Sequence, residues 1–472
     1  MKTKFQLSLA CLSLAAATSV MAAGEATNVI FFLGDGMGPT TVTASRIYKY
    51  GEDGKLTMES LKRTARIKTY SLDGQTTDSA PSMAAYMTGV KMRNEVISMS
   101  PETLPRSSNT SASEYRNGAE STCPATGNGQ PVKTLLEYAK AAGKSVGAVT
   151  TTSITHATPA ATYSHICNRN GENAIAAQLV PGGTGTGAYA FNTALGDGVD
   201  VLLGGGTDQF LPAKRADGRD LTAELQAKGY TYVNSGTALS ALNTATTTKL
   251  LGLFNPYLMN YELDRAKPAN NINEPSLADM TEKAIKVLQK NSKGFFLMVE
   301  GGRIDHALHN TNAKRALEDT VAFDEAIKRA LGLIDLKNTL VVVTADHDHT
   351  MTINGYSHKG NPILGKVTDI KKTTVNKTPT LATAADSKPY TALVFGNGGV
   401  RNGVRDDLST VDTAADDYYQ EVGVKLGSAG AYPETHGGGD VMLFSDGAGS
   451  AGFKGTLDNT KVFTLVKNAL GL

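Results

Sequence analysis

Acidic and histidine residues recur just after short apolar runs of this chain, at positions from which they could bind metal ions. Asp35, Glu300 and the pair Asp346 and His347 each follow such a run. In an open α/β sheet the carboxyl ends of parallel strands meet at one edge, and ligands bind there. We therefore expect these four side chains to converge in space, although they lie far apart in the sequence.

A second candidate pair lies shortly after Glu300. Asp305 and His309 are four residues apart, and this spacing puts both side chains on one face of a helical turn. A carboxylate and an imidazole suit zinc, which takes oxygen and nitrogen ligands. A surface ion pair between Asp305 and a protonated His309 is the alternative, but the neighbouring acidic and histidine residues favour a metal site.

The four consecutive residues 346–349 form the densest group of possible ligands. They read Asp-His-Asp-His and follow an apolar run, and buried carboxylates beside such a strand need partners. A solvated loop is the alternative, and it suits the apolar neighbourhood less well. His436 stands alone in a glycine-rich turn, where the backbone can approach a crowded site closely. Taken alone, such a histidine is more often structural than a ligand.

Ser79 is the candidate nucleophile. Pro81 favours the first turn of a helix, so Ser79 is expected at a helix N-terminus. The positive end of the helix dipole would there favour an alkoxide and an incoming phosphate. The pattern also fits a simple helix cap made by Asp78 or Ser79. Arg169 could bind two phosphate oxygens with its guanidinium, although a surface arginine is the alternative.

The elements that must position these residues are predicted from apolar runs separated by helical patterns. Most runs lack polar alternation, as do parallel strands that are covered on both faces. Ser276 has the setting of a helix N-cap, with Asp279 three residues on. Alternating strands and helices predict a doubly wound, mostly parallel central sheet with helices on both faces. The runs are residues 28–33, 146–149, 199–203, 295–299, 340–343, 391–395 and 441–444.

Two polar stretches rich in small residues interrupt this pattern, at about 98–130 and 354–433. They are predicted to be insertions on one α/β domain, residues 23–472, rather than linkers between domains.

Residues 1–22 have the pattern of a signal peptide, with Lys2 and Lys4 before an apolar stretch and small residues at its end. A buried N-terminal helix is the alternative. We expect an exported protein, periplasmic or extracellular.

The composition of the chain limits the classes of molecule that it is expected to bind. The chain has 472 residues and a formal net charge of +1, without a long basic run, which argues against nucleic acid as the main partner. No apolar stretch reaches the roughly 18 residues of a membrane span.

Export would leave Cys123 and Cys167 in the mature chain, and this even number suggests one disulfide. Two free buried thiols are the alternative.

Taken together, these motifs resemble those of the alkaline phosphatase family, over nearly the whole mature chain from residue 34 to about residue 440. The motifs are specific in combination, and the stretch 295–309 is closer to animal-type members than to the enteric-bacterial type. The matching segments are residues 34–38 (Gly-Asp-Gly-Met-Gly), 77–80 (Thr-Asp-Ser-Ala), 155–160 (Thr-His-Ala-Thr-Pro-Ala), 299–306 (Val-Glu-Gly-Gly-Arg-Ile-Asp-His), 344–347 (Thr-Ala-Asp-His) and 435–438 (Thr-His-Gly-Gly).

The resemblance implies a phosphomonoesterase with two zinc ions and one magnesium ion, and a homodimer whose fold carries an inserted crown-like subdomain. Ser79 matches the serine that becomes phosphorylated, and Arg169 the arginine that binds phosphate. One zinc would be held by Asp305, His309 and His436, and the other by Asp35, Asp346 and His347. Asp35, Thr158 and Glu300 match the magnesium ligands, and His349 matches a histidine that steadies a zinc-bound carboxylate.

Two positions depart from the enteric-bacterial pattern and resemble the animal type. His156 stands where the enteric group has Asp, so the hold on magnesium should be weaker, and we expect His156 to act through water. His306 stands where that group has Lys, and loss of a fixed ammonium should ease release of phosphate. Glu262 and Glu274 lie in a stretch that holds calcium in animal-type members, but solvated carboxylates are expected here.

Sulfatases and phosphodiesterases of the same superfamily are the nearest alternatives. A sulfatase needs Pro and Arg two and four residues after its nucleophile, whereas Ser79 is followed by Pro81 and Met83. A phosphodiesterase usually has a Thr nucleophile and lacks the magnesium ligands. A non-catalytic metal-binding or adhesion protein is the alternative from another class, and it would not need Ser79 and Arg169 together.

Overall fold

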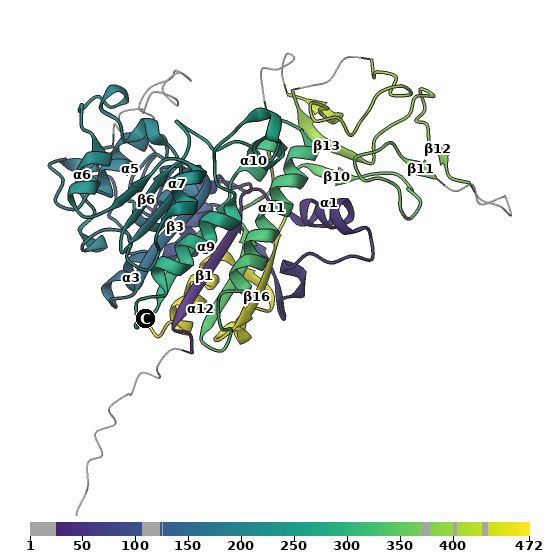
Figure 1. The fold of residues 1–472 in the computed structure, drawn as a ribbon. Coiled ribbons are helices and arrows are strands. Elements are labelled where there is room, and N and C mark those ends of the chain that lie inside the picture. The colour runs from purple at the N-terminus through teal and green to yellow at the C-terminus, as the bar shows by residue number, and fades with distance from the viewer. Residues whose placement is uncertain (1–24, 106–122, 125, 370–377, 400–403, 427–432) are drawn as a thin grey trace, which may run out of the picture.

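The computed structural model describes residues 25–105, 123–124, 126–369, 378–399, 404–426 and 433–472. The predicted signal peptide, residues 1–22, lies outside them, as does the middle of the stretch 98–130. A ten-stranded sheet runs through the molecule in the order β17-β2-β16-β8-β1-β7-β3-β4-β6-β5 (Figure 1). Its strands are β1 Asn28–Gly34, β2 Arg63–Lys68, β3 Ser145–Ser153, β4 Val201–Gly205, β5 Thr231–Val233, β6 Leu250–Leu253, β7 Phe295–Gly301, β8 Thr339–Ala345, β16 Val441–Gly447 and β17 Gly455–Asp458.

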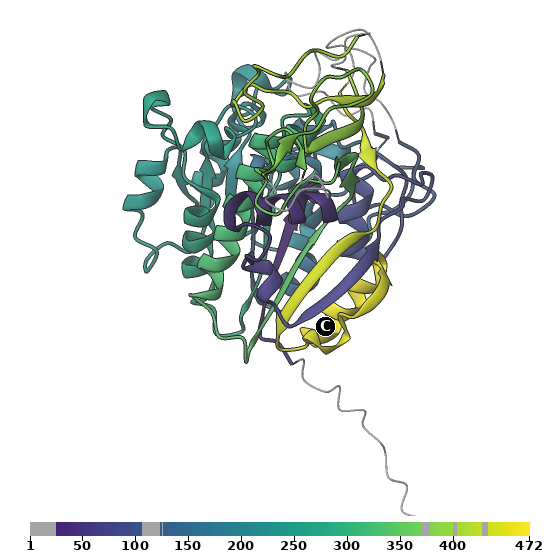
Figure 2. The same cartoon turned by 90° about the vertical axis from the view of Figure 1, so that its right-hand side faces the viewer.

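The sheet is mostly parallel, as the sequence predicted. Only β16 runs antiparallel to its two neighbours, β2 and β8, and Figure 2 shows it as the yellow strand beside β2. The central strands β1 and β8 consist mainly of apolar residues, and Val29, Phe31 and Leu33 of β1 are fully buried. Such runs suit strands that are covered on both faces.

Helices cover both faces of the sheet. α9 and α11 pack together on one face, and α2, α3, α4 and α12 lie on the other. The Ser276 side chain accepts a hydrogen bond from the Asp279 N–H at the start of α9, as predicted. The helices are α1 Pro39–Tyr50, α2 Ser79–Thr88, α3 Leu135–Ala141, α4 Ala157–Tyr163, α5 Glu172–Gln178, α6 Leu221–Ala227, α7 Gly236–Ala241, α8 Glu262–Arg265, α9 Leu277–Leu288, α10 Arg303–His309, α11 Ala313–Leu331 and α12 Asn459–Ala469.

A small subdomain stands beyond the carboxyl ends of the central strands (Figure 1). In it β10 Met351–Ile353, β13 Leu393–Gly398 and β14 Val422–Lys425 form a separate three-stranded sheet. The apolar run 391–395 therefore forms a strand outside the central sheet. A two-stranded ribbon, β11 Thr368–Asp369 with β12 Thr380–Leu381, lies beside it.

Cys123 and Cys167 form a disulfide, so the prediction of one bridge is confirmed. In the part of the chain that is described, no helix combines the length and apolar character that a membrane crossing demands.

Candidate active site

The central strands bring the predicted acidic residues to one edge of the sheet. β8, β1 and β7 are parallel neighbours, and Asp346, Asp35 and Glu300 lie at their carboxyl ends. All three side chains are fully buried. Burial, followed by the negative charges of Asp346, Asp305 and Glu300, raises the pKa of Asp35 well above its usual range. Buried carboxylates this close together require a compensating positive charge.

Three histidines surround Asp305 on α10. Its Oδ1 lies 2.8 Å from His349 Nε2 and 3.3 Å from His309 Nε2. The Nε2 of His436, which arrives from the glycine-rich turn, is 3.5 Å from the same oxygen. The ligand atoms of these four residues are close enough together to hold one ion. The spacing of Asp305 and His309 thus places both on the side of α10 that faces this cluster.

The hydrogen bonds of two of these histidines fit a metal site. His309 Nδ1 donates to the carbonyl oxygen of Glu434, and His436 Nδ1 donates to that of Thr77 at 2.9 Å. In a neutral ring Nε2 is then a bare acceptor, since a neutral imidazole carries only one proton. The two Nε2 atoms lie 3.1 Å apart, where two lone pairs repel unless a metal ion or a proton lies between them. Burial opposes a proton on His436, but the hydrogen bond to Asp305 raises its pKa. Hydrogen bonds from Nδ1 to carbonyls are the arrangement in which zinc-binding histidines are held.

Ser79 lies between the groups of possible ligands. It begins α2, with Asp78 at the N-cap, as the sequence predicted. Its Oγ is 3.0 Å from His347 Nε2 and 3.3 Å from Asp35 Oδ1. Asp35, Asp305 and His347 form a second group that could hold an ion, and Asp346 Oδ2 is 3.4 Å from His347 Nε2. One oxygen each of Asp35 and Asp346 is buried without a hydrogen bond, which suits a ligand.

A third group lies on the other side of Asp35. Asp35, His156 and Glu300 have ligand atoms near enough for one ion. The Thr158 hydroxyl and Glu300 Oε1 are buried there without a hydrogen-bond partner among the described residues, so an oxygen-seeking cation would satisfy them. Burial raises the pKa of Glu300 to about 7, although a hydrogen bond from the Thr150 hydroxyl acts to lower it. The ligand atom of His156 lies within 4.8 Å of those of Asp35 and Glu300, and its action through water stays a prediction.

Arg169 lies beside Ser79 because Asp78 holds it there. Its Nη1 donates to Asp78 Oδ1, and Nη2 is 3.1 Å from His156 Nε2. The other Asp78 oxygen accepts from the Glu95 N–H at 2.9 Å, and the Glu95 carbonyl accepts from the Arg169 N–H at 2.8 Å. The guanidinium is thus fixed at the N-terminus of α2, where an anion would bind.

His349 and His306 differ in charge. Burial opposes protonation of His349, but hydrogen bonds to Asp305 and Glu434 outweigh it and raise its pKa to about 10. Burial, followed by the charge of Arg303, lowers the pKa of His306 to about 4. His306 is therefore neutral at physiological pH and lies with its ring 5.5 Å from that of His156.

The sequence analysis missed Glu434, which is 1% exposed. It accepts from His349 Nδ1 at 2.6 Å and from the Thr350 N–H at 2.7 Å. Its position two residues before His436 was the available signal. Asp348, in contrast, belongs to none of the three groups. It accepts from the His349 N–H and fills the space that the missing side chain of Gly38 leaves.

The expectation that Glu274 is solvated is wrong, because it is 7% exposed. Its carboxylate accepts from the Asn255 side chain at 2.6 Å and from the Asn260 N–H at 2.8 Å. Glu262 forms an ion pair with Arg265 at 2.6 Å. Both carboxylates therefore have protein partners.

Comparison with known proteins agrees with this geometry. The family model described as alkaline phosphatase matches residues 26–472. The chain belongs to the alkaline phosphatase family. Hydrolysis of phosphate monoesters is the known function of this metal-dependent family, and the chain is a phosphoric monoester hydrolase.

The relatives include animal enzymes, as residues 295–309 suggested. The tissue-nonspecific alkaline phosphatase of Rattus norvegicus is 39% identical over 453 residues, which cover 89% of this chain and 79% of the relative. The alkaline phosphatase of Gadus morhua is 38% identical over 454 residues, 90% of this chain and 87% of the relative. The crystal structure of Thermus thermophilus alkaline phosphatase has 27% identity and a TM-score of 0.68, covering 98% of this chain and 96% of that one.

Proposed function

We propose that Ser79 is the nucleophile of this phosphatase and is phosphorylated during turnover. The observation that carries the proposal is the position of its Oγ, within 3.3 Å of Asp35 and 3.0 Å of His347, between the groups of buried ligands. As Oγ attacks phosphorus, its proton passes to water, and the bond from phosphorus to the ester oxygen breaks so that this oxygen leaves with the electron pair and is released as the alcohol after it takes up a proton from water. The N-terminus of α2 favours the negative charge on Oγ. Water then cleaves the phosphoserine, which restores Ser79 and releases phosphate.

We further propose two zinc ions and one magnesium ion at this site. Asp305, His309 and His436 would hold one zinc, and Asp35, Asp346 and His347 the other, since mixed imidazole and carboxylate ligands suit zinc. Asp35, Thr158 and Glu300 would hold magnesium, which prefers oxygen. When bound, the ions would supply the positive charge that stabilises the attacking and leaving oxygens.

In this proposal Arg169 binds the phosphate and the histidines tune the site. Two nitrogens of a guanidinium can bind two phosphate oxygens, and Asp78 holds this one beside Ser79. His349 steadies Asp305 by its 2.8 Å contact. His156 and His306 lie near the proposed position of the phosphate. That position therefore has less fixed positive charge than it would have with a lysine in place of His306.

Trapping the intermediate tests the nucleophile. The metal-loaded enzyme is mixed briefly with an aryl phosphate, quenched in acid and digested, and the peptides are weighed by mass spectrometry. We expect phosphate on Ser79, and a loss of at least about a thousandfold in kcat for Ser79→Ala. Ser60→Ala, at an exposed serine, is the control and should keep full activity. Phosphate on another residue would refute the assignment.

Metal analysis tests the ligands separately. The chain should contain two zinc ions and one magnesium ion after dialysis. We expect His309→Ala to lose zinc and Glu300→Gln to lose magnesium first. Phosphate monoesters, phosphate diesters and sulfate esters assayed side by side would separate the proposed activity from those of the related enzymes.

The organisation of the mature protein is also a proposal. We propose a signal peptide at residues 1–22, a mature domain at 23–472 with insertions at about 98–130 and 354–433, and a homodimer outside the cytoplasm. The pattern of residues 1–22 and the disulfide support export. N-terminal sequencing of the mature protein and light scattering on the purified enzyme test these points.

A further inference from the structure

Glu434 is a buried carboxylate to which the proposed mechanism gives no part, although it lies against the histidines around Asp305. One of its oxygens accepts a hydrogen bond from His349 Nδ1 at 2.6 Å. The other accepts from the Thr350 N–H at 2.7 Å and also from the Thr350 hydroxyl. Since its side chain has no exposed surface, these donors replace the water that a carboxylate would otherwise need.

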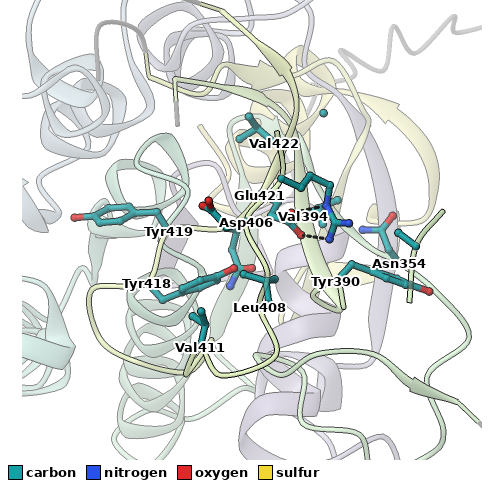
Figure 3. Close-up of a pocket in the computed structure, with 14 residues that line it drawn as sticks. Asn354, Tyr390, Val394, Asp406, Leu408, Val411, Tyr418, Tyr419, Glu421 and Val422 are labelled. Carbon is teal, nitrogen blue, oxygen red and sulfur yellow. Dashed lines mark hydrogen bonds and ion pairs between the residues drawn. The ribbon is translucent and has the colours of Figure 1, made fainter. Parts of the chain in front are cut away.

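The charged contacts of Glu434 are histidines of the site. Among the described residues no lysine or arginine forms an ion pair with it, and its charged contacts are His349 at 2.6 Å and His309 at 3.9 Å. Glu421 of the inserted subdomain is different, because Figure 3 shows its carboxylate against a guanidinium, that of Arg405, which lies 2.8 Å away. The carboxylate of Glu434 is therefore bound to the histidine cluster rather than to a structural ion pair.

The backbone of Glu434 holds a second histidine. Its N–H donates to the His309 carbonyl at 2.9 Å, and its carbonyl accepts from His309 Nδ1. Two residues further on, His436 pairs with His349 in a short antiparallel ladder. The three histidines that contact Asp305 are thus all connected to the segment 434–436.

We propose that Glu434 is a positioning residue for the zinc ligands Asp305 and His309, an inference that rests on the metal site proposed above. Its carboxylate holds His349 so that Nε2 stays 2.8 Å from Asp305 Oδ1, which fixes the orientation of the Asp305 carboxylate. Its backbone carbonyl fixes the ring of His309. Glu434 belongs to none of the three groups of possible ligands, so it acts through its neighbours and should not affect the other proposed zinc site.

Zinc affinity tests this role without a measurement of activity. The stripped full-length proteins are titrated with zinc alone, in competition with a chromophoric chelator. We expect the wild type to bind two zinc ions, and Glu434→Leu to bind one of them roughly 10–100-fold more weakly and the other unchanged. Glu434→Gln should restore most of this affinity, because its amide can still form hydrogen bonds with His349 and Thr350.

Asp324→Ala is the matched control. Asp324 is also a buried carboxylate, 1% exposed, and it accepts from the N–H groups of Thr57 and Met58 at 2.8 and 2.9 Å. It belongs to none of the three ligand groups. Its loss should lower the stability but leave both zinc affinities as in the wild type.

A second variant covers the case in which Glu434→Leu does not fold, which circular dichroism would show. Glu434→Asp keeps the charge but shortens the side chain, so that it cannot reach both of its partners. It should weaken one zinc ion at least about tenfold.

The outcomes separate this inference from the proposed function. A wild type that binds fewer than two zinc ions would overturn the metal site and the role of Glu434 with it. A wild type with two zinc ions and Glu434 variants of unchanged affinity would overturn the role of Glu434 alone. Equal weakening of both ions, or weakening in Asp324→Ala as well, would be a general loss of stability and would also exclude a positioning role.

Discussion

At the scale of single residues, the partner of each histidine decides what it can do. His309 and His436 donate from Nδ1 to backbone carbonyls, so their Nε2 lone pairs are available to a metal. His349 lies between the carboxylates of Asp305 and Glu434 and is a cation instead. A histidine can therefore act as a metal ligand or as a counter-charge, according to whether its Nδ1 partner is a carbonyl or a carboxylate.

The pair His156 and His306 gives the first prediction. Both have a lowered pKa, chiefly from burial, so both leave the site without the charges that Asp and Lys would bring. We expect His156→Asp combined with His306→Lys to tighten magnesium binding about tenfold and to lower kcat, because phosphate would leave more slowly. Magnesium titration of the stripped enzyme and steady-state kinetics measure this. Unchanged values in the double variant, compared with each single variant, would contradict it.

Most of the candidate site could be predicted from residue types placed after apolar runs. Asp35, Glu300 and Asp346 end buried strands, and Asp305 and His309 have helical spacing. Glu434 could not be found this way, because it follows no apolar run. Its position two residues before His436 was a signal, but that spacing does not show that distant segments bury the carboxylate. Its role depends on His349, to which it is joined only in the folded chain.

At the scale of elements, the backbone around Arg169 is held from two sides. Ile97 and Ile166 pair as an isolated antiparallel β-bridge, and the Arg169 N–H donates a hydrogen bond to the Glu95 carbonyl. Glu95 itself has a φ of 71°, a conformation that costs energy for a side chain other than glycine. Cys167, two residues before Arg169, is tied to Cys123. Arg169, the proposed phosphate-binding residue, thus lies on a segment that is held by hydrogen bonds and by a covalent link.

Removal of the disulfide gives the second prediction. The two cysteines are 44 residues apart, and a loop of that length is expected to contribute up to about 4 kcal/mol by restricting the unfolded chain. Cys123→Ala with Cys167→Ala should lower the free energy of unfolding in urea by up to that amount. Because Arg169 lies so close, KM for an aryl phosphate should rise more than kcat falls. A variant that loses stability but keeps its KM would show that the bridge does not position Arg169.

The third prediction concerns the contact between α11 and α8. Asp319 of α11 accepts from the Glu262 N–H at 3.2 Å, and burial raises its pKa to about 8. A carboxyl whose pKa is raised on folding stabilises the protein below its unfolded pKa and loses that effect as pH rises through the folded value. Between pH 7 and 9 the loss is about 1 kcal/mol.

Asp319→Asn should therefore remove this part of the pH dependence. The free energy of unfolding would be measured in denaturant at pH 7 and pH 9. The wild type and Glu325→Gln, a change at an acid of the same helix whose side chain is 43% exposed, should lose stability between the two values. Asp319→Asn should lose about 1 kcal/mol less. An equal loss in all three proteins would exclude Asp319 as the source.

The elements themselves were predicted unevenly. β1, β3, β7 and β8 are apolar runs covered on both faces, and such runs are visible in sequence. β2 was missed because Arg63, Arg66 and Lys68 are exposed, so its apolar positions alternate with charged ones over only six residues. The 391–395 run forms a strand but joins the three-stranded sheet, since partner choice depends on tertiary contacts that a local pattern does not contain.

At the scale of the whole molecule, the proposed metal site joins distant parts of the chain. Asp35 follows β1 near the N-terminal end of the described chain, and His436 lies shortly before β16 near its C-terminal end. Between them, α4, β7, α10 and the segment after β8 supply the other proposed ligands. Cations bound here would link these elements directly, so their binding free energy would add to the stability of the fold.

Metal removal should therefore change both the stability and its pH dependence. In the stripped protein burial raises the pKa of Glu300 to about 7, so stability from this group is present below about pH 4.5 and is lost as pH rises through about 7. In the loaded protein the cations favour the ionised carboxylates, and their binding strengthens as protons leave. Free metal at a thousand times its Kd adds about 4 kcal/mol to the free energy of unfolding.

Calorimetry from pH 5 to 8 should thus show melting temperatures that fall with pH for the stripped enzyme but not for the loaded one. Glu300→Gln should flatten the stripped profile, and parallel profiles for the loaded and stripped wild type would contradict a metal site at these carboxylates.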